Sequence, residues 1–388
     1  MFPATRLAAL ERLDQFLETG SRYAKERNFV RPGHESVSRL SPAIRHGLLT
    51  TDEASRAALD RYAFSTVEKF VQELWWRTYW KGWLEMRPQV WRQWTQQAQA
   101  LRTERSELVE RAEQGETGVA IMDHFARELR ATGYLHNHAR MWYAAFWVHE
   151  LKLPWEAGAD FFFRELLDGD SASNTLSWRW VAGRQTPGKS YLARRSNLEK
   201  YLDPKLLAAH RAGLERLEQP QALDPGEVTR IPANLKALAA PAALPEGPLT
   251  LWVHEEDLSP ETIPGEWAER VERVLLAPAR SAWDQFDFSE RKCQWLEAAL
   301  TDAQERLCER FPGRVERLAD LAEVSWDSRT VAAYPDQGVV RDALAEGARP
   351  HWLFREAQVD LYPQAKGGFF GFWKKLAARW QAGELFLR

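Results

Sequence analysis

The sequence of 388 residues predicts a multi-domain protein in which an all-α portion is followed by a small α/β portion. From Asp52 to Leu217 apolar residues recur almost throughout at helical spacing, and glycine or proline falls at the joints. After residue 248, short apolar runs alternate with helical segments, which is typical of a mixed unit. We therefore expect an all-α domain over 1–218, a linker over 219–248 and a small α/β domain over 249–388.

Individual elements follow from the spacing of apolar residues. Residues 4–19 form one apolar helical stripe that ends at Gly20, namely Leu7, Leu10, Leu13, Phe16 and Leu17. The stretch 219–248 contains six prolines, which favour extended and semi-rigid chain. Strands are expected at 249–253, 271–277, 330–334 and 351–355, and helices at 289–311 and 368–387.

Composition narrows the possible classes of protein. The longest uninterrupted apolar run, Met141–Val148, is far too short to cross a bilayer, and charged residues interrupt the N-terminal pattern where a secretory signal needs an uncharged core. The two cysteines, Cys293 and Cys308, are too few for an iron–sulfur cluster and lack metal-ligand spacing. We expect a cytoplasmic protein that uses neither a membrane nor a metal.

Charge and tryptophan content suggest where a partner could bind. Residues 1–240 carry 34 Lys and Arg against 30 Asp and Glu, whereas the rest of the chain carries 18 against 25. A nucleic-acid partner would therefore belong to the first portion. The 19 tryptophans fit packing, binding of planar ligands, or electron transfer between rings.

The stretch from Thr132 to Trp180 groups a cation, amides and two carboxylates beside tryptophans. Arg140 can offer a bidentate contact to Asp168 or Asp170, which would leave the other carboxylate for a ligand N–H group. Asn137 and Asn174 can hold the edge of a heteroaromatic ring. The alternative is an ordinary pair of helices with an N-capping aspartate and a surface ion pair.

Several segments of the chain resemble the flavin-binding helical domain of the DNA photolyase and cryptochrome family. They are SRLSPAIRHGLLT (38–50), QELWWRTYW (72–80), TGVAIMDHFARELRATGYLHNHARM (117–141) and LLDGDSASNTLSWRW (166–180). The resemblance covers roughly residues 20–205. LTLWVHEEDLSP (249–260) faintly resembles the start of the family's α/β antenna domain, which ordinarily precedes the flavin domain. The C-terminal portion is then either a permuted relative of that domain or an unrelated α/β module.

The resemblance implies FAD as cofactor and assigns residues to it. Its phosphates would lie against a helix start. Asp170 would accept the ring N–H, Arg140 and Asp168 would pair beside the reactive nitrogen, and Asn174 would face that nitrogen. The full set of cofactor residues is Tyr23, Ser38, Arg39, Leu40, Ser41, Arg77, Asn137, Arg140, Asp168, Asp170 and Asn174. The family usually has threonine where this chain has Val37, and without the other motifs SRLSP would indicate only a capped helix start with Pro42 in its first turn.

The resemblance also implies a pocket for a cyclobutane pyrimidine dimer, formed by Glu73, Trp76, Asn137, His138, Met141 and Trp180. His138 stands where the family has arginine, and each aromatic residue could instead be core packing. Two tryptophans, Trp178 and Trp155, match the family's electron relay. Arg102 lies near the position of the third, so Trp91 or Trp94 are candidates to replace it. As catalytic residues we expect Glu73, Asn137, Asn174, Trp178 and Trp155.

These features predict a light-dependent photolyase that contains FAD and splits pyrimidine dimers in damaged DNA, single- or double-stranded, after flipping them out of the stack. The alternative is a flavin photoreceptor of cryptochrome type that signals through a protein partner and repairs nothing. A third possibility is a flavin-binding remnant without activity. The oligomeric state does not follow from the sequence.

Overall fold

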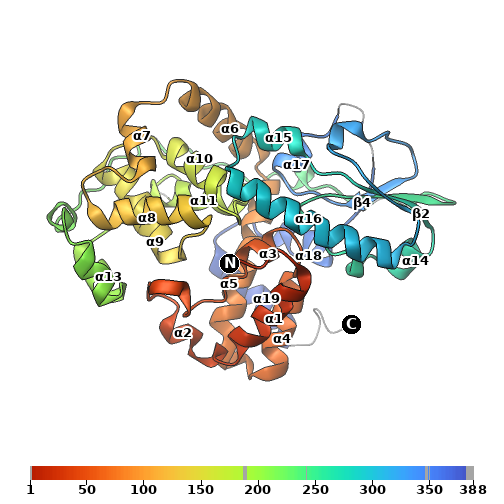
Figure 1. Cartoon of the computed structure of the whole chain (residues 1–388), viewed down its shortest axis with the longest axis horizontal. Helices are drawn as coiled ribbons and strands as arrows, with labels where there is room; N and C mark the ends of the chain where they lie inside the picture. The colour runs from red at the N-terminus through yellow and green to blue at the C-terminus, as the bar shows by residue number, and fades with distance from the viewer. Residues whose placement is uncertain (1, 187–189, 242, 346–347, 349, 382–388) are drawn as a thin grey trace. The chain divides into compact units, whose positions relative to one another are not determined.

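A computed structural model describes residues 2–186, 190–241, 243–345, 348 and 350–381 of the chain (Figure 1). It divides into two compact units. The first unit comprises Met1–Ser21, Leu40–Pro88 and Pro232–Arg388, and the second comprises Arg22–Arg39 and Gln89–Ile231. Both units are built from non-contiguous segments, and each is described by itself.

The second unit is helical. Its helices are α2 (Tyr23–Glu26), α6 (Pro88–Thr103), α7 (Glu107–Gln114), α8 (Ala120–Thr132), α9 (Asn137–Ala145), α10 (Trp155–Glu165), α11 (Ser171–Val181), α12 (Arg195–Tyr201) and α13 (Pro204–Ala209). A π-helical turn, η3 (Phe146–Glu150), continues α9, and 3-10 turns lie at Pro32–His34 and Leu214–Leu217. The core contains many aromatic side chains, among them the buried Trp142, Tyr143 and Phe162.

The first unit contains a helical layer and a sheet. Its N-terminal helices are α1 (Arg6–Leu17), α3 (Ser41–Arg45), α4 (Thr51–Arg61) and α5 (Phe64–Glu85). Thr5 caps α1, and Thr50 forms a reciprocal capping box with Glu53 at the start of α4, which satisfies backbone donors that a helix start leaves open. The last helix, α19 (Phe369–Gln381), packs against α5.

The sheet has five parallel strands in the order β3-β2-β1-β4-β5. The strands are β1 (Leu249–Val253), β2 (Val271–Leu276), β3 (Val315–Arg317), β4 (Thr330–Ala333) and β5 (His351–Leu353). The accompanying helices are α14 (Gly265–Ala268), α15 (Arg280–Gln285), α16 (Glu290–Arg310), α17 (Val339–Asp342) and α18 (Glu356–Asp360), with 3-10 turns at Leu235–Ala237, Pro260–Thr262, Leu321–Glu323 and Tyr362–Gln364, the last being η8. Helix α16 packs against β2 and β3 (Figure 1). Because the chain passes from β1 to β2 on one side and returns to β4 on the other, the topological switch point lies between β1 and β4.

The expected fold class is confirmed, since a helical portion is followed by a small parallel α/β portion. The four predicted strands and the helices at 4–19 and 289–311 are present, and the sequence did not reveal β3, which is only three residues long. The helix expected at 368–387 is described to Gln381, and the rest of that range lies outside the described residues. The domain boundaries 1–218, 219–248 and 249–388 remain predictions. The two compact units divide the chain at other positions. Among the described residues, the helices lack the length and apolarity needed to span a bilayer.

Candidate functional site

An ion pair in the second unit joins α9 to the turn before α11. Arg140 Nη2 lies 3.0 Å from Asp168 Oδ2, and Arg140 Nε donates to the carbonyl oxygen of Leu135 at 2.7 Å. The Asp168 side chain is only 4% exposed and that of Arg140 is 22% exposed. A carboxylate this deeply buried needs such a partner, because burial without one costs several kcal/mol, on the order of 3–5. The structure thus brings together the two residues that the sequence proposed as a pair.

Asp170 is buried and caps α11. Its Oδ1 accepts a hydrogen bond from the backbone N–H of Ser173 at 2.7 Å. The N-capping contact that the sequence offered as the alternative role for this aspartate is therefore present. It occupies Oδ1 of the carboxylate, and a capping contact to one oxygen is compatible with a ligand contact to the same group.

Three polar residues share one buried side of α11. Asn174 and Thr175 lie three and four positions after Ser171, so the side chains of both neighbour that of Ser171 on the helix surface. Asn174 Nδ2 donates to the carbonyl oxygen of Ala159 at 2.8 Å, which fixes the orientation of the amide. Within the described part of the chain, the hydroxyl groups of Ser171 and Thr175 have no hydrogen-bond partner.

Two unpartnered hydroxyl groups on one buried face are unusual, because a buried polar group without a partner costs about 1–3 kcal/mol. A polar ligand beside α11 would remove that cost. Together with the Arg140 and Asp168 pair, these hydroxyls fit a planar cofactor that carries both hydrogen-bonding edges and negative charge.

Two neighbours of Arg140, His136 and Tyr134, are held in uncharged form. Burial lowers the pKa of His136 to about 3, so its imidazole is neutral at physiological pH. Burial likewise raises the pKa of Tyr134 to about 12, and the Tyr134 ring lies 5.4 Å from the guanidinium carbon of Arg140. Positive charge at this place therefore comes from Arg140 rather than from the adjacent histidine.

The predicted phosphate-binding segment is divided between the two units. Tyr23, Ser38 and Arg39 belong to the second unit, and Leu40, Ser41 and Arg77 belong to the first. Arg39 adopts a left-handed backbone conformation with φ of 60°, which is uncommon for a residue other than glycine, and its Nη1 donates to the carbonyl oxygen of Gly33 at 3.1 Å. Ser41 starts α3 with Pro42 in the first turn, so the helix start expected from the sequence is present.

The predicted substrate residues fall into two groups. In the first unit, α5 carries Glu73 and Trp76, and the ring of Trp76 stacks on Phe369 with centroids 3.5 Å apart and an interplanar angle of 10°. In the second unit, Asn137 Nδ2 lies 3.9 Å from Met141 Sδ. The Trp180 ring lies 5.7 Å from that of Tyr191.

His138 is held by protein groups. Its Nδ1 is 2.8 Å from the carbonyl oxygen of Asn28, and its ring stacks on Trp142 at 4.2 Å. Burial lowers its pKa, so it is neutral at physiological pH. A neutral, buried imidazole cannot supply the charge of the arginine that the family has at this position, and its role in substrate binding remains a prediction.

Trp178 lies in an aromatic cluster. Its ring is 5.0 Å from Phe162 and 6.2 Å from Trp147, in both cases edge to face, and Gly158 on α10 leaves the space that the Trp178 ring fills. Trp147 was not singled out in the sequence, because it lies in an apolar run that indicates core packing.

The other tryptophans considered for the electron relay are buried, and Arg102, near the position of the third, is ion-paired. Trp155 is 6% exposed, with the Arg179 guanidinium 6.0 Å from its ring. Trp91 and Trp94 are buried, with centroids 5.0 Å apart. Arg102 lies 3.5 Å from Asp160 in an ion pair.

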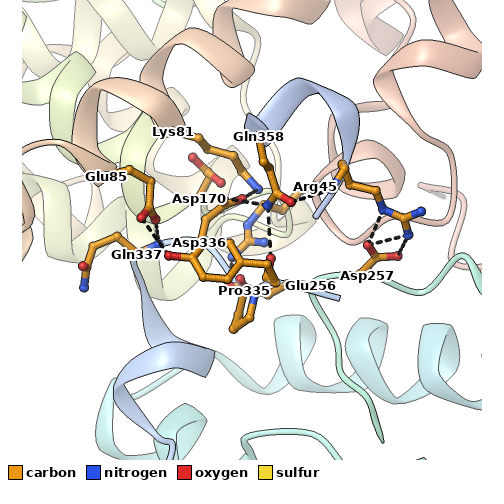
Figure 2. A network of polar contacts seen from close by, with 12 residues as sticks. Arg45, Lys81, Glu85, Asp170, Glu256, Asp257, Pro335, Asp336, Gln337 and Gln358 are labelled. Atoms are coloured by element: carbon orange, nitrogen blue, oxygen red, sulfur yellow. Dashed lines mark hydrogen bonds and ion pairs between the residues drawn. The ribbon is translucent and has the colours of Figure 1, made fainter. Parts of the chain in front are cut away.

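A second polar cluster, which the sequence did not reveal, lies in the first unit and includes residues that follow β1 and β4 in the chain. Figure 2 shows side chains of this cluster, among them Lys81, Glu85 and Asp336. Asp336 accepts hydrogen bonds from Lys81 Nζ and the Tyr362 hydroxyl, both at 2.7 Å. Burial alone would raise the pKa of Asp336, but Lys81 and Tyr362 lower it below its usual value.

Glu85 belongs to the same cluster. It pairs with Arg341 at 3.0 Å and accepts a hydrogen bond from the Gln337 backbone N–H, while burial raises its pKa. Arg45 also pairs with Glu256 at 2.6 Å. Parallel α/β sheets commonly bind ligands beyond the carboxyl ends of their strands, and here α5 and α3 supply ion-pair partners to residues that follow β4 and β1.

Comparison with known proteins finds a match to the helical portion of the chain. A family model described as the FAD binding domain of DNA photolyase matches residues 70–205. The chain is similar to the deoxyribodipyrimidine photo-lyase of Escherichia coli (strain K12), at 32% identity over 49% of this chain and 42% of the relative. It is also similar to a deoxyribodipyrimidine photo-lyase of Thermus thermophilus, at 39% identity over 45% of this chain and 42% of the relative.

Among solved structures, a bacterial class III photolyase from Agrobacterium tumefaciens aligns over 51% of this chain and 42% of its own, with a TM-score of 0.44 and 26% identity. The chain spans about two fifths of the length of the two curated relatives named above. The matched residues include α9, α11 and the paired Arg140 and Asp168, so this portion is a helical FAD-binding domain. This portion is therefore similar to the FAD binding domain of DNA photolyase over residues 70–205, and its cofactor is FAD.

Proposed function

We propose that the protein is a light-dependent photolyase that splits cyclobutane pyrimidine dimers in DNA. The proposal rests on the buried pair of Arg140 and Asp168 and on the unpartnered hydroxyls of Ser171 and Thr175 on α11, the helix that follows Asp168 in the chain. The names of the relatives support the reaction class, since both are deoxyribodipyrimidine photo-lyases. The chemistry that bound, reduced FAD would supply is absorption of light and donation of one electron to the dimer.

The residues of the second unit would hold and polarise the cofactor. Asp170 would accept its ring N–H, and Asn174, oriented by the carbonyl oxygen of Ala159, would face the reactive edge. Arg140 is held in place by the buried Asp168, so its guanidinium would stand in a fixed position to stabilise negative charge on the cofactor. Neutral His136 adds no second positive charge that would compete with this effect.

The proposed substrate residues bind and orient the dimer. Glu73 would accept hydrogen bonds from pyrimidine N–H groups, while Trp76 and Trp180 would provide stacking surfaces. Asn137 and Met141 lie one helical turn apart on α9 and offer an amide and a flexible apolar contact. These residues would act on a dimer that is flipped out of the stack, because the target atoms cannot be reached inside a duplex.

Electron resupply would run through the tryptophans of the second unit. Trp178 and Trp155 are the proposed relay residues, and Trp147 is added because its ring contacts that of Trp178. Trp91 and Trp94 form a pair of their own, and their ring contacts in the described residues include Phe163.

Two measurements test the proposal. Purified protein should contain FAD, identified after release, and the combined change Asp170→Ala and Arg140→Ala should abolish the flavin absorption. Illuminated, reduced protein should convert a thymine dimer in an oligonucleotide, and Glu73→Gln should convert it more slowly at unchanged flavin content. Wild-type protein that contains no flavin, and takes none up on reconstitution, would refute the proposal.

A cryptochrome-like photoreceptor is the second candidate, and the position of His138 favours it. The imidazole that replaces the family's arginine is turned to the carbonyl oxygen of Asn28 and to the ring of Trp142. Flavin that is reduced under light while the dimer persists, in both single-stranded and duplex DNA, would select this candidate over repair.

A further inference from the structure

The segment Leu361–Gln381 differs in composition from the chain before it. Residues 241–360 contain 24 Asp and Glu against 13 Lys and Arg. The segment contains six aromatic residues and four cations and lacks Asp and Glu altogether. A locally basic and aromatic stretch thus follows an acidic one, and such a stretch is typical of nucleic-acid contact rather than of a solvated helix.

The segment is fixed to α5 by aromatic and polar contacts. Phe369 is 3% exposed and stacks on Trp76 at 3.5 Å. The Tyr79 hydroxyl donates to the carbonyl oxygen of Gly367 at 2.7 Å, and Trp373 Nε1 donates to Glu68 at 3.2 Å. These contacts order the backbone on both sides of residue 370.

Phe370 is presented to solvent from this ordered backbone. Its exposed fraction is 70%, against 67% for Leu7, and its ring lies 6.5 Å from Trp76 at an angle of 80°. Among the described residues, the other strongly exposed large apolar side chains are aliphatic. Full burial of such a side chain is worth about 1.5–3 kcal/mol, so an ordered chain that leaves this ring in water forgoes that stabilisation.

Three lysines lie within five sequence positions of Phe370. Lys366, Lys374 and Lys375 are exposed, and Lys375 Nζ is 3.0 Å from the neutral amide oxygen of Gln364 rather than from a carboxylate. The fourth cation, Arg379, pairs with Asp360 at 3.2 Å. Three exposed positive charges therefore accompany, in the same short segment, an exposed ring that can stack on a planar group.

We propose that the segment from Lys366 to Lys375 is a contact surface for a DNA strand, in which Phe370 stacks on a base and the lysines bind phosphates. Positive charge and an exposed aromatic ring together fit single-stranded nucleic acid, since every base offers a face for stacking and every phosphate a negative charge. A membrane surface fits less well, because an interfacial helix needs a broad apolar face and the other large apolar side chains of α19 are buried or, for Trp380, partly buried.

The surface adjoins Trp76, which the proposed function places against the damaged base, so the inference rests on that function. Phe369 fixes the segment to Trp76 while its neighbour Phe370 faces solvent, so the strand beside the lesion would meet a ring in a fixed position. The surface itself needs neither light nor flavin.

The test uses the full-length protein in the dark with a short, undamaged, fluorescently labelled single-stranded oligonucleotide. Phe370→Ala should weaken binding by about five- to one-hundred-fold, as loss of one base-stacking ring does, and Phe370→Trp should restore it. Lys374→Gln with Lys375→Gln should reduce the slope of log affinity against log salt by about 0.7 for each lysine. Leu7→Ala, which removes an equally exposed apolar side chain, is the matched control and should leave binding unchanged.

Unchanged or tighter binding of the oligonucleotide by Phe370→Ala would overturn the inference. It would also be overturned if the wild type bound anionic phospholipid vesicles and Phe370→Ala lost that binding while it retained DNA binding. Flavin content and dimer repair in the same preparations separate the two proposals. If Phe370→Ala weakens DNA binding in a protein without flavin, the contact surface stands and the photolyase proposal fails. If dimers are repaired and Phe370→Ala binds DNA as the wild type does, only the contact surface is refuted.

Discussion

Replacing Arg140 with alanine tests the reasoning about the flavin pocket most directly. The change removes the ion pair to Asp168 at 3.0 Å and the hydrogen bond to the carbonyl oxygen of Leu135 at 2.7 Å. It also leaves a carboxylate that is 4% exposed without its cation. Removing one member of a buried pair costs about 3–5 kcal/mol. Because the Arg140 side chain is 22% exposed and water can reach part of the site, we expect the lower end, about 3 kcal/mol.

The assay is urea denaturation followed by tryptophan fluorescence, with flavin content measured on the same samples. Arg140→Ala should unfold at lower urea and contain little flavin, and Arg140→Ala combined with Asp168→Asn should regain part of the stability because the buried charge is gone. Arg195→Ala, which breaks exposed pairs to Glu199 and Glu218, is the control and should resemble the wild type. Wild-type stability and wild-type flavin content in Arg140→Ala would refute the assignment of this pair to the pocket.

Three further predictions concern the cofactor and the first unit. Ser171→Ala with Thr175→Val should weaken FAD binding while leaving the flavin-free protein at least as stable as the wild type, because neither hydroxyl has a described protein partner. Isothermal titration measures the affinity for FAD and thermal unfolding measures the stability. Unchanged affinity would contradict the prediction. Lys81→Met should destabilise the protein at neutral pH. Lys81 helps to lower the pKa of Asp336, so its contribution is present above the unfolded pKa of about 3.9 and is lost as pH falls through the lower folded value. Denaturation curves of variant and wild type should therefore converge in acid, and a constant difference would count against the prediction. Gly82→Ala places a Cβ 2.8 Å from Tyr362 Cα, so the backbone must shift and unfolding should become easier by about 1–3 kcal/mol, whereas Gly371→Ala meets no atom within 4 Å and serves as its control.

The elements that were predictable from the sequence are those with a local signal. Leu249–Val253 is apolar except at Thr250, Val271–Leu276 ends in three apolar residues, and α16 has a long apolar stripe, so these elements have a local signal in the sequence. The short strand β3, Val315–Arg317, has one apolar residue in three and gives no such signal. Strand order is not local either, because it depends on which crossover each strand makes.

The candidate site was predictable where residue types were unusual for their surroundings. Arg140 and Asp168 are 28 positions apart, yet a cation and a carboxylate in apolar sequence each require a partner. Glu85 and Arg341 are 256 positions apart, and neither stands out from the other charged residues of the chain. The stacking of Phe369 on Trp76 was missed for the same reason, since both rings could equally be core packing.

The difference between the sequence-based domains and the compact units has a physical cause in α5. The first part of this helix carries Glu73 and Trp76, which sequence assigns to the flavin domain, while Lys81 and Glu85 at its end form ion pairs with residues that follow β4. A buried carboxylate at 1% side-chain exposure, such as Glu85, depends on Arg341 as Asp168 depends on Arg140. Helix α5 therefore belongs to the flavin domain by sequence and to the first unit by packing. A division of the chain at the proline-rich linker would separate Lys81 and Glu85 from their ion-pair partners.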